Sequence, residues 1–267
     1  MGSEDHVPLF ARYGFTRTAD SAAPLVVEPY DAVCVHGALR ATVVASAIDL
    51  VGGFVTRALA GSEATFTTDL SLRIPAPSAP DRLVAHAEVL RPGRRLVTTA
   101  VRLATGAVDF AQGVVTFMRV PRDPGTAAPT DLATPAEIPF HPLARPLDAE
   151  VGIEPVSGTP GTVRLPLAPR LLNPEGVLQG ALVALLCESA ALARAQASGL
   201  AHRVVTELDL RYLAAASLGP VTATADWIGE PDQGALALTL RDEGRDRRVA
   251  TAFARLARAP GRGTVTA

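Results

Sequence analysis

The sequence has no lysine, a single asparagine and a single tryptophan, and its aromatic content is only 4%. All 25 basic residues are therefore arginines, and they are balanced by 27 acidic residues to give a formal charge of -2. A near-neutral chain has no general field that would attract a polyanion, so nucleic acid is not an expected partner.

Cysteine is also scarce. Cys34 and Cys187 lie in apolar surroundings and match no metal or redox spacing, which predicts two buried, reduced thiols. The five histidines show no mutual spacing typical of a metal site, and there is no HExxH pair, so no metal is predicted. The absence of G-x-S-x-G leaves a serine-hydrolase elbow unsupported.

No long hydrophobic segment is present either. The start, "MGSEDHVPLFARYGF", lacks a basic region followed by an apolar one, and no charge-free apolar run reaches about 18 residues. These absences predict a cytoplasmic protein with no membrane partner. The 267 residues, 48% of them hydrophobic, suffice for one large domain or two of ordinary size.

A composition break divides the chain near its middle. Residues 121–139, "PRDPGTAAPTDLATPAEIP", are rich in Pro, Thr and Ala and have no apolar periodicity, as is typical of a linker. We therefore predict an N-terminal domain over 1–120 and a C-terminal domain over 140–267.

The two halves contain an internal repeat. Gly37–Asp49, "GALRATVVASAID", aligns with Gly176–Glu188, "GVLQGALVALLCE", at four identical positions of 13. Thr68–Arg73, "TDLSLR", aligns with Thr206–Arg211, "TELDLR", at four of six positions, one residue out of phase with the first match. One deletion in the intervening loop of the second half accounts for the phase change.

Each half has the same order of predicted elements. A long apolar helix is expected over roughly 38–60 and again over 180–198, too apolar on all sides for a surface helix. β-Branched alternating runs broken by Gly, Pro and Asp turns follow each helix and predict three antiparallel strands. Each half is thus expected to be an α+β unit in which a sheet wraps one buried helix.

This order, with a glycine at the helix start and an acid within the helix, resembles the hotdog-fold superfamily. "NPEGVLQGALVALLCESA" is similar to the Asn-x-x-Gly-x-x-(His/Gln)-Gly-Gly…Asp segment of the phenylacetate-pathway (PaaI-type) acyl-CoA thioesterases, and "FTTDLSLRI" to the strand that follows their helix. The resemblance implies a tandem double hotdog that hydrolyses an acyl-CoA or related thioester. It further implies CoA as part of the substrate, no other cofactor, and assembly into a homo-oligomer.

The family pattern also implies site residues in the second half. Its oxyanion donor is the backbone N–H of a glycine eight residues before the acid, and Gly180 stands eight before Glu188. Gln179 and Asn173 match the family's amide positions, although Ala181 replaces the second glycine of the motif.

The first half retains the opposite part of the pattern. It has lost the amides and the glycine, since Cys34, Arg40 and Ala41 stand at those positions. It keeps the acid, Asp49, and a hydroxyl eighteen residues later, Thr67, where the family holds its water.

Family members build each site across a dimer, so a fused pair is expected to have one composite site. The complete site combines Asn173, Gln179 and Gly180 with Asp49 and Thr67. The other site combines Arg40 with Glu188 and has Val205 at the hydroxyl position, so it is expected to be degenerate, with Glu188 a relic or a modest second acid.

The resemblance assigns roles to these residues. Asp49, with a pKa raised by desolvation, serves as general base or nucleophile, and Thr67 orients water. The Gly180 N–H holds the oxyanion at the helix N-terminus, and Gln179 and Asn173 contact the thioester or fix the loop.

Structural readings of the same residues remain open. Asp49 could lie exposed at a helix bend, Asn173 could simply begin a turn, Gly180 could permit close packing, and Thr67 is a common strand residue.

Two other functions remain open as well. One is a hotdog hydratase or dehydratase acting on enoyl or hydroxyacyl thioesters, although neither helix offers the His that this chemistry usually uses. The other is a non-catalytic acyl-CoA-binding protein. The sequence leaves open the acyl group, the identity of the thiol and the number of subunits.

Overall fold

The computed structural model describes residues 9–18, 24–61, 63–121, 140–173 and 176–260. Apart from Pro121, the predicted linker lies outside the described residues. Within the described part, a single antiparallel sheet of 12 strands runs through both halves of the chain, and a small hairpin of β3 (Cys34–Val35) and β4 (Ala38–Leu39) stands beside it.

The strands of the large sheet divide equally between the two halves. Those of the first half are β1 (Phe15–Arg17), β2 (Leu25–Val27), β5 (Ala64–Arg73), β6 (Leu83–Pro92), β7 (Leu96–Thr105) and β8 (Val108–Val120). Those of the second half are β9 (Glu154–Pro155), β10 (Thr162–Leu165), β11 (Arg203–Tyr212), β12 (Val221–Trp227), β13 (Ala235–Asp242) and β14 (Arg247–Arg258).

Strand order in the sheet is β1-β2-β6-β7-β8-β5-β11-β14-β13-β12-β10-β9. Reading outward from the centre, each half has the same arrangement, and the halves join where β5 pairs antiparallel with β11. Ser71 pairs with Asp209, its own equivalent in the repeat, so a local two-fold relationship passes between these two residues.

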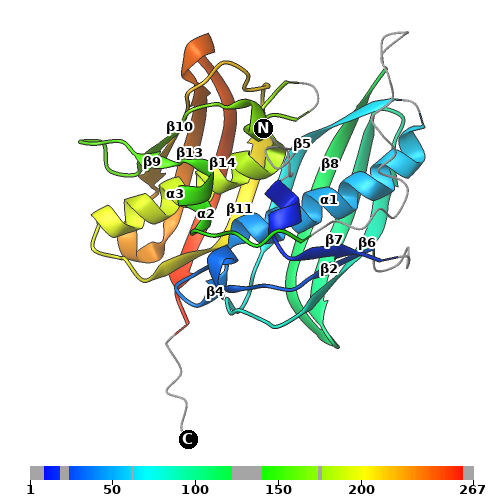
Figure 1. Ribbon diagram of the computed structural model, residues 1–267, viewed down its shortest axis with the longest axis horizontal. Helices are drawn as coiled ribbons and strands as arrows, with labels where there is room; N and C mark the ends of the chain where they lie inside the picture. Colours follow the sequence, from blue (N-terminus) through cyan, green and yellow to red (C-terminus); the bar gives the residue numbers. More distant parts are fainter. Residues whose placement is uncertain (1–8, 19–23, 62, 122–139, 174–175, 261–267) are drawn as a thin grey trace, which may run out of the picture.

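One long helix lies on the sheet in each half. α1 (Ala41–Ala60) packs on β5 to β8, and α3 (Gly180–Ala197) packs on β10 to β14, as Figure 1 shows at right and left. The helices also contact each other, so both lie on the same face of the sheet. A short helix, α2 (Leu147–Val151), begins the second half.

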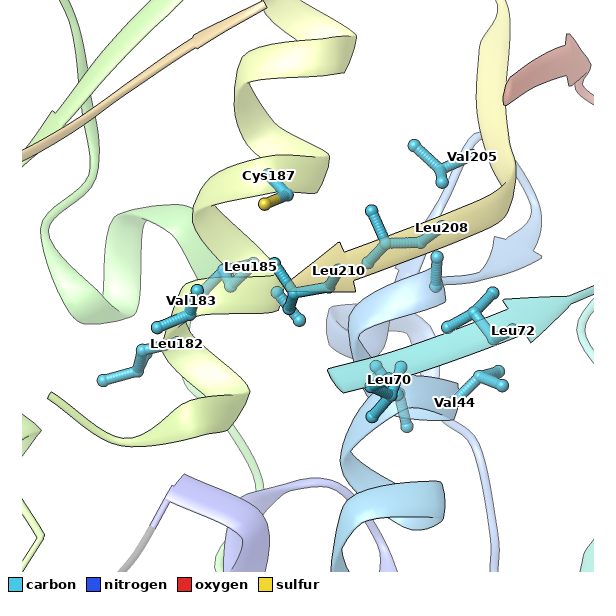
Figure 2. Packing of buried hydrophobic residues seen from close by; sticks show 14 of the residues in the cluster. Val44, Leu70, Leu72, Leu182, Val183, Leu185, Cys187, Val205, Leu208 and Leu210 are labelled. Atoms are coloured by element: carbon cyan, nitrogen blue, oxygen red, sulfur yellow. The ribbon is translucent and has the colours of Figure 1, made fainter. Parts of the chain in front are cut away.

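The hydrophobic core is continuous across the junction of the halves. Figure 2 shows Leu70 and Leu72 of β5 beside Leu208 and Leu210 of β11, with α1 and α3 near them. All four leucines are almost fully buried, and strand alternation places their neighbours on the opposite face. Both helices are long and apolar enough to cross a membrane by composition alone, but much of each helix lies inside this core.

The observed helices agree closely with the predicted ones. Both begin at the same position of the repeat, at Ala41 and Gly180. The helix predicted from residue 38 starts at Ala41 because residues 38 and 39 form β4 instead.

The prediction of two buried thiols was wrong for one of them. Cys187 is buried in α3, but Cys34 is only half-buried because it lies in β3, where both residues are partly exposed. Burial nevertheless raises the pKa of the Cys34 thiol to about 11 and that of Cys187 to about 12, so both thiols are protonated at neutral pH.

Candidate active site

Asp49 lies in the middle of α1 and faces the strand that follows the helix. Thr67 of β5 donates a hydrogen bond from Oγ1 to Asp49 Oδ1 at 2.7 Å. Asp49 as a whole residue is partly buried. Its location excludes the alternative in which Asp49 is an exposed residue at a helix bend. Burial raises the pKa of Asp49 to about 6, and the Thr67 hydrogen bond opposes this rise.

Gly180, the first residue of α3, lies opposite Asp49. A β-carbon added to Gly180 would stand 3.7 Å from Asp49 Oδ2 and 3.5 Å from the hydroxyl of Tyr212. Two residues that are 131 positions apart in the sequence therefore meet across the two halves. The fold thus brings the acid of the first half to the glycine of the second.

The first turn of α3 has unused hydrogen-bond donors. Leu182 and Val183 donate to the carbonyl of Gln179, whereas the N–H groups of Gly180 and Ala181 have no acceptor among the described residues. The first N–H groups of any helix lack partners within the helix and carry its positive dipole end. Here they lie close to a carboxylate that the helix does not itself supply.

Gln179 and Asn173 form bonds within the loop that precedes α3. Gln179 Nε2 donates to the carbonyls of Arg170 and Leu172 at 3.3 and 3.4 Å. Asn173 Oδ1 accepts the N–H of Val177 at 3.1 Å. Of the two roles allowed by the sequence, contact with a thioester or support of the loop, these bonds provide the second.

The equivalent position in the other half is occupied by Glu188. Its carboxylate accepts the N–H of Ala41 at 2.9 Å, the N–H of Thr42 at 3.2 Å and the Thr42 hydroxyl. Glu188 is 1% exposed. The N-terminus of α1 thus already holds an anion at the two positions where α3 leaves its donors unpaired.

Arg40 is buried beside this carboxylate and links it to Asp148, which is partly exposed. Its Nε lies 3.0 Å from Glu188 Oε2, and Nη1 lies 2.7 Å from Asp148 Oδ2 of α2. Burial lowers the pKa of the Arg40 guanidinium, but Glu188 and Asp148 outweigh burial and raise it overall. Ser189 donates a further bond to Asp148.

These contacts change the interpretation of Glu188. The sequence allowed a relic or a modest second acid, and the structure shows that four hydrogen bonds hold the carboxylate in place, one of them from the buried Arg40. Both oxygens of the Glu188 carboxylate therefore already accept hydrogen bonds from the protein.

The hydroxyl position differs between the halves. β5 has a bulge between Thr67 and Asp69, and β11 has one between Val205 and Glu207. Bulges at the same place in the repeat make Val205 the structural counterpart of Thr67. Val205 is buried and has no hydroxyl to offer Glu188.

Sequence reasoning missed Tyr212 and Asp148. Tyr212 ends β11, directly after the matched segment "TELDLR", and its hydroxyl donates to the Gly180 carbonyl at 3.1 Å. Extending the repeat alignment by one residue would have paired it with Ile74 and shown a hydroxyl on one side only. Asp148 lies in a short helix that has no counterpart among the matched segments, so no signal identified it.

Other features of the described residues lie outside this site. A surface hollow on the face of the sheet turned away from α1 is lined by β5 to β8, including Arg73, His86 and Arg102. Among the described residues no group of three or more His, Cys, Asp or Glu side chains could hold a metal ion.

Comparison with known proteins gives the fold a name. No family model and no curated protein matches the sequence. Many solved structures share the fold. A protein described as an oleoyl thioesterase from Lactobacillus plantarum aligns with a TM-score of 0.60 and 12% identity, over 88% of this chain and 96% of that one.

Two further structures give the same result. An acyl-ACP thioesterase from Bacteroides thetaiotaomicron aligns with a TM-score of 0.58 and 12% identity over 87% and 95% of the two chains. The acyl-CoA thioesterase II TesB2 from Mycobacterium marinum aligns with a TM-score of 0.55 and 13% identity over 95% and 99%. The fold is a double hotdog. At these identities the likeness shows the fold, and the chemistry of this double hotdog must be argued from its own residues.

Proposed function

We propose that this double hotdog is a thioesterase that hydrolyses an acyl-CoA or related acyl thioester at one composite site. The observation that carries the proposal is the position of Glu188. Its carboxylate binds the first two N–H groups of α1 and thereby marks where this fold accepts an anionic oxygen. By the internal repeat, the equivalent donors of α3 are available for the oxyanion of a thioester under attack.

Asp49 supplies the other half of the chemistry. A carboxylate with a pKa near 6 is ionised at neutral pH and is a better base than an ordinary aspartate. Thr67 fixes its orientation through Oδ1, which leaves Oδ2 facing Gly180.

The reaction follows from this geometry. Asp49 takes a proton from a water molecule as the water oxygen bonds to the thioester carbon. The electron pair of the C=O π bond moves to the carbonyl oxygen, which accepts hydrogen bonds from the N–H groups of Gly180 and Ala181. The tetrahedral intermediate then collapses, the C–S bond breaks, and the thiolate takes the proton back from Asp49. Water and thioester give a carboxylic acid and a thiol, and no other cofactor is consumed.

The arrangement favours the PaaI-type pattern, in which the acid and the oxyanion donor come from different hotdog units. It does not select the thiol: the structural neighbours include one named for acyl-CoA and one named for acyl-ACP. Both thiols end in the same phosphopantetheine arm, so the reacting groups are identical.

Thiol release tests the proposal. Short, medium, long and aryl acyl-CoAs and one acyl-carrier-protein thioester are offered to the wild type and to Asp49→Asn, and the freed thiol is followed with a disulfide reagent. A blank with protein alone is required because Cys34 and Cys187 are free thiols. Turnover by the wild type that is lost in Asp49→Asn is the expected result.

Each other outcome has a definite meaning. Tight binding of acyl-CoA without release would identify a binding protein and refute the thioesterase. Loss of absorbance from an enoyl-CoA without thiol release would identify a hydratase. Equal losses of activity in Asp49→Asn and Glu188→Gln, measured per folded molecule, would refute the single composite site.

A further inference from the structure

Tyr212 is the fourth residue at the meeting point of the two halves. It ends β11, next to the bulge of β5 that follows Thr67. Its hydroxyl donates to the Gly180 carbonyl at 3.1 Å, and its ring lies 3.8 Å from the place of a Gly180 β-carbon. The site is therefore bordered by α1, β5, α3 and β11, one residue from each.

The Tyr212 hydroxyl is hydrogen-bonded to the first peptide unit of α3, which carries one of the proposed oxyanion donors. The Gly180 carbonyl and the Ala181 N–H belong to one planar trans peptide, in which C=O and N–H point in opposite directions. Fixing the carbonyl therefore fixes the direction of the Ala181 N–H, which is one of the two unpaired donors of α3. A hydrogen bond on one side of the peptide sets the geometry on the other.

The internal repeat supplies independent support. The counterpart of Tyr212 in the other half is Ile74, which is buried and has no hydroxyl. At that site the first two N–H groups of the helix are already held by Glu188. At this strand position a hydroxyl is thus present beside the helix whose first two N–H groups have no acceptor among the described residues, and absent beside the helix whose first two N–H groups bind Glu188.

The chemistry of the phenol suits this task. Burial raises the pKa of Tyr212 well above its ordinary value, and the neighbouring Asp49 carboxylate raises it further. The phenol therefore stays neutral and remains a donor to the Gly180 carbonyl throughout the pH range in which Asp49 ionises.

We propose that Tyr212 is a positioning residue of the composite site, which holds the first peptide unit of α3 so that its N–H groups aim at the thioester oxygen. The inference rests on the proposed thioesterase function. It predicts an effect on the transition state, where the oxygen carries charge, and little effect on ground-state binding.

The experiment compares Tyr212→Phe, which removes only the hydroxyl, with Tyr30→Phe. Tyr30 is a suitable control because its hydroxyl also donates to a backbone carbonyl, that of Arg12, at 2.5 Å, and lies outside the composite site; it also accepts the N–H of Leu143 at 2.9 Å. For Tyr212→Phe we expect kcat to fall about tenfold, less than the 10²–10³ typical of losing an oxyanion donor itself. KM should stay within about twofold of the wild type, and Tyr30→Phe should retain the wild-type kcat.

A spectroscopic measurement separates positioning from a structural role. The acyl-CoA that the wild type cleaves fastest, labelled with ¹³C at the carbonyl, is bound to Asp49→Asn with and without Tyr212→Phe. A well-aimed donor polarises the carbonyl and lowers its stretching frequency, so the double variant should show a smaller shift at full occupancy.

If the wild type is active and Tyr212→Phe changes neither kcat nor the carbonyl frequency shift, this inference is overturned while the proposed function stands. A parallel loss in Tyr30→Phe would also overturn it, because the effect would then reflect stability. A wild type that cleaves no thioester would refute the proposed function and, with it, the role of Tyr212.

Discussion

The Glu188 carboxylate accepts a hydrogen bond from the backbone N–H of Ala41 at 2.9 Å, so an acid from the second half binds the N-terminus of the helix of the first half. At the equivalent position of the first half, Asp49 faces Gly180 but accepts a hydrogen bond from Thr67. One of the two related carboxylates is thus bound by the first N–H groups of a helix, and the other lies beside a helix whose first two N–H groups have no acceptor in the described part of the chain. This asymmetry has consequences for stability and activity that can be measured.

Asp49→Asn should be inactive and yet more stable than the wild type at pH 8. Between its ordinary value of 3.8 and its folded pKa of about 6, the native state binds more protons than the unfolded chain. Stability is therefore lost as the pH rises through this window, and the loss is complete above it. Asparagine does not ionise, so this loss is absent in Asp49→Asn. The free energy of unfolding of the variant should exceed that of the wild type by about 1–3 kcal/mol at pH 8, and the difference should vanish near pH 4. Urea unfolding at both pH values measures it, and an equal gain at both would contradict the argument.

The pH dependence of kcat/KM should report the ionisation of Asp49. Activity should rise as the pH passes about 6, because only the carboxylate form is a base. Thr67→Val removes a hydrogen bond that lowers this pKa, so the acid limb should move to higher pH. Thr67→Ser should restore it. Thr206 is a strand threonine of the other half whose hydroxyl donates to the Arg255 carbonyl, so Thr206→Val should leave the acid limb of the pH profile unchanged.

Gly180→Ala should fold normally but lose at least about tenfold in kcat/KM. The added methyl meets its neighbours at 3.5–3.8 Å, which is ordinary van der Waals contact, so the protein can accommodate it. The methyl would nevertheless fill the space beside Asp49 Oδ2 that the reacting thioester needs. Thermal unfolding together with steady-state kinetics distinguishes the two effects, and full activity in a folded variant would place the thioester elsewhere.

Glu188→Gln should destabilise the protein by about 3 kcal/mol, because breaking a buried ion pair leaves a charge without its partner. The amide also has one acceptor oxygen in place of the two that bind Ala41, Thr42 and Arg40. The remaining contact of Arg40 with Asp148 limits the loss. Denaturant titration measures the stability, and activity per folded molecule should match the wild type. A stable but inactive variant would mean that Glu188 takes part in catalysis.

Much of the fold could be predicted from the sequence because local patterns determine it. Apolar residues lie on all sides of the helices over 41–60 and 180–197, so these helices are stable only when buried. Apolar and polar residues alternate in the segments that follow each helix, which fits strands with one buried face. Two aligned copies of this order imply two similar units, and the matching helix starts at Ala41 and Gly180 agree with the alignment.

The geometry of the candidate site could be predicted only in part. The spacing of Asp49, Thr67 and Gly180 follows from their positions in the repeat, and the resemblance paired them across the halves. The bonds of Asn173 and Gln179 within their loop could not be predicted, since amide side chains suit either role.

The order of amino acids alone specifies which residues each half retains: the acid and hydroxyl in the first, the glycine in the second, and a glutamate and an arginine where the pattern is broken. What the retained and broken positions do depends on how the halves pack. The pairing of β5 with β11 brings Gly180 and Tyr212 to Asp49, and it encloses Glu188 with Arg40. The state of a carboxylate is fixed by its burial and its hydrogen-bond partners, and here both come from segments far apart in the chain.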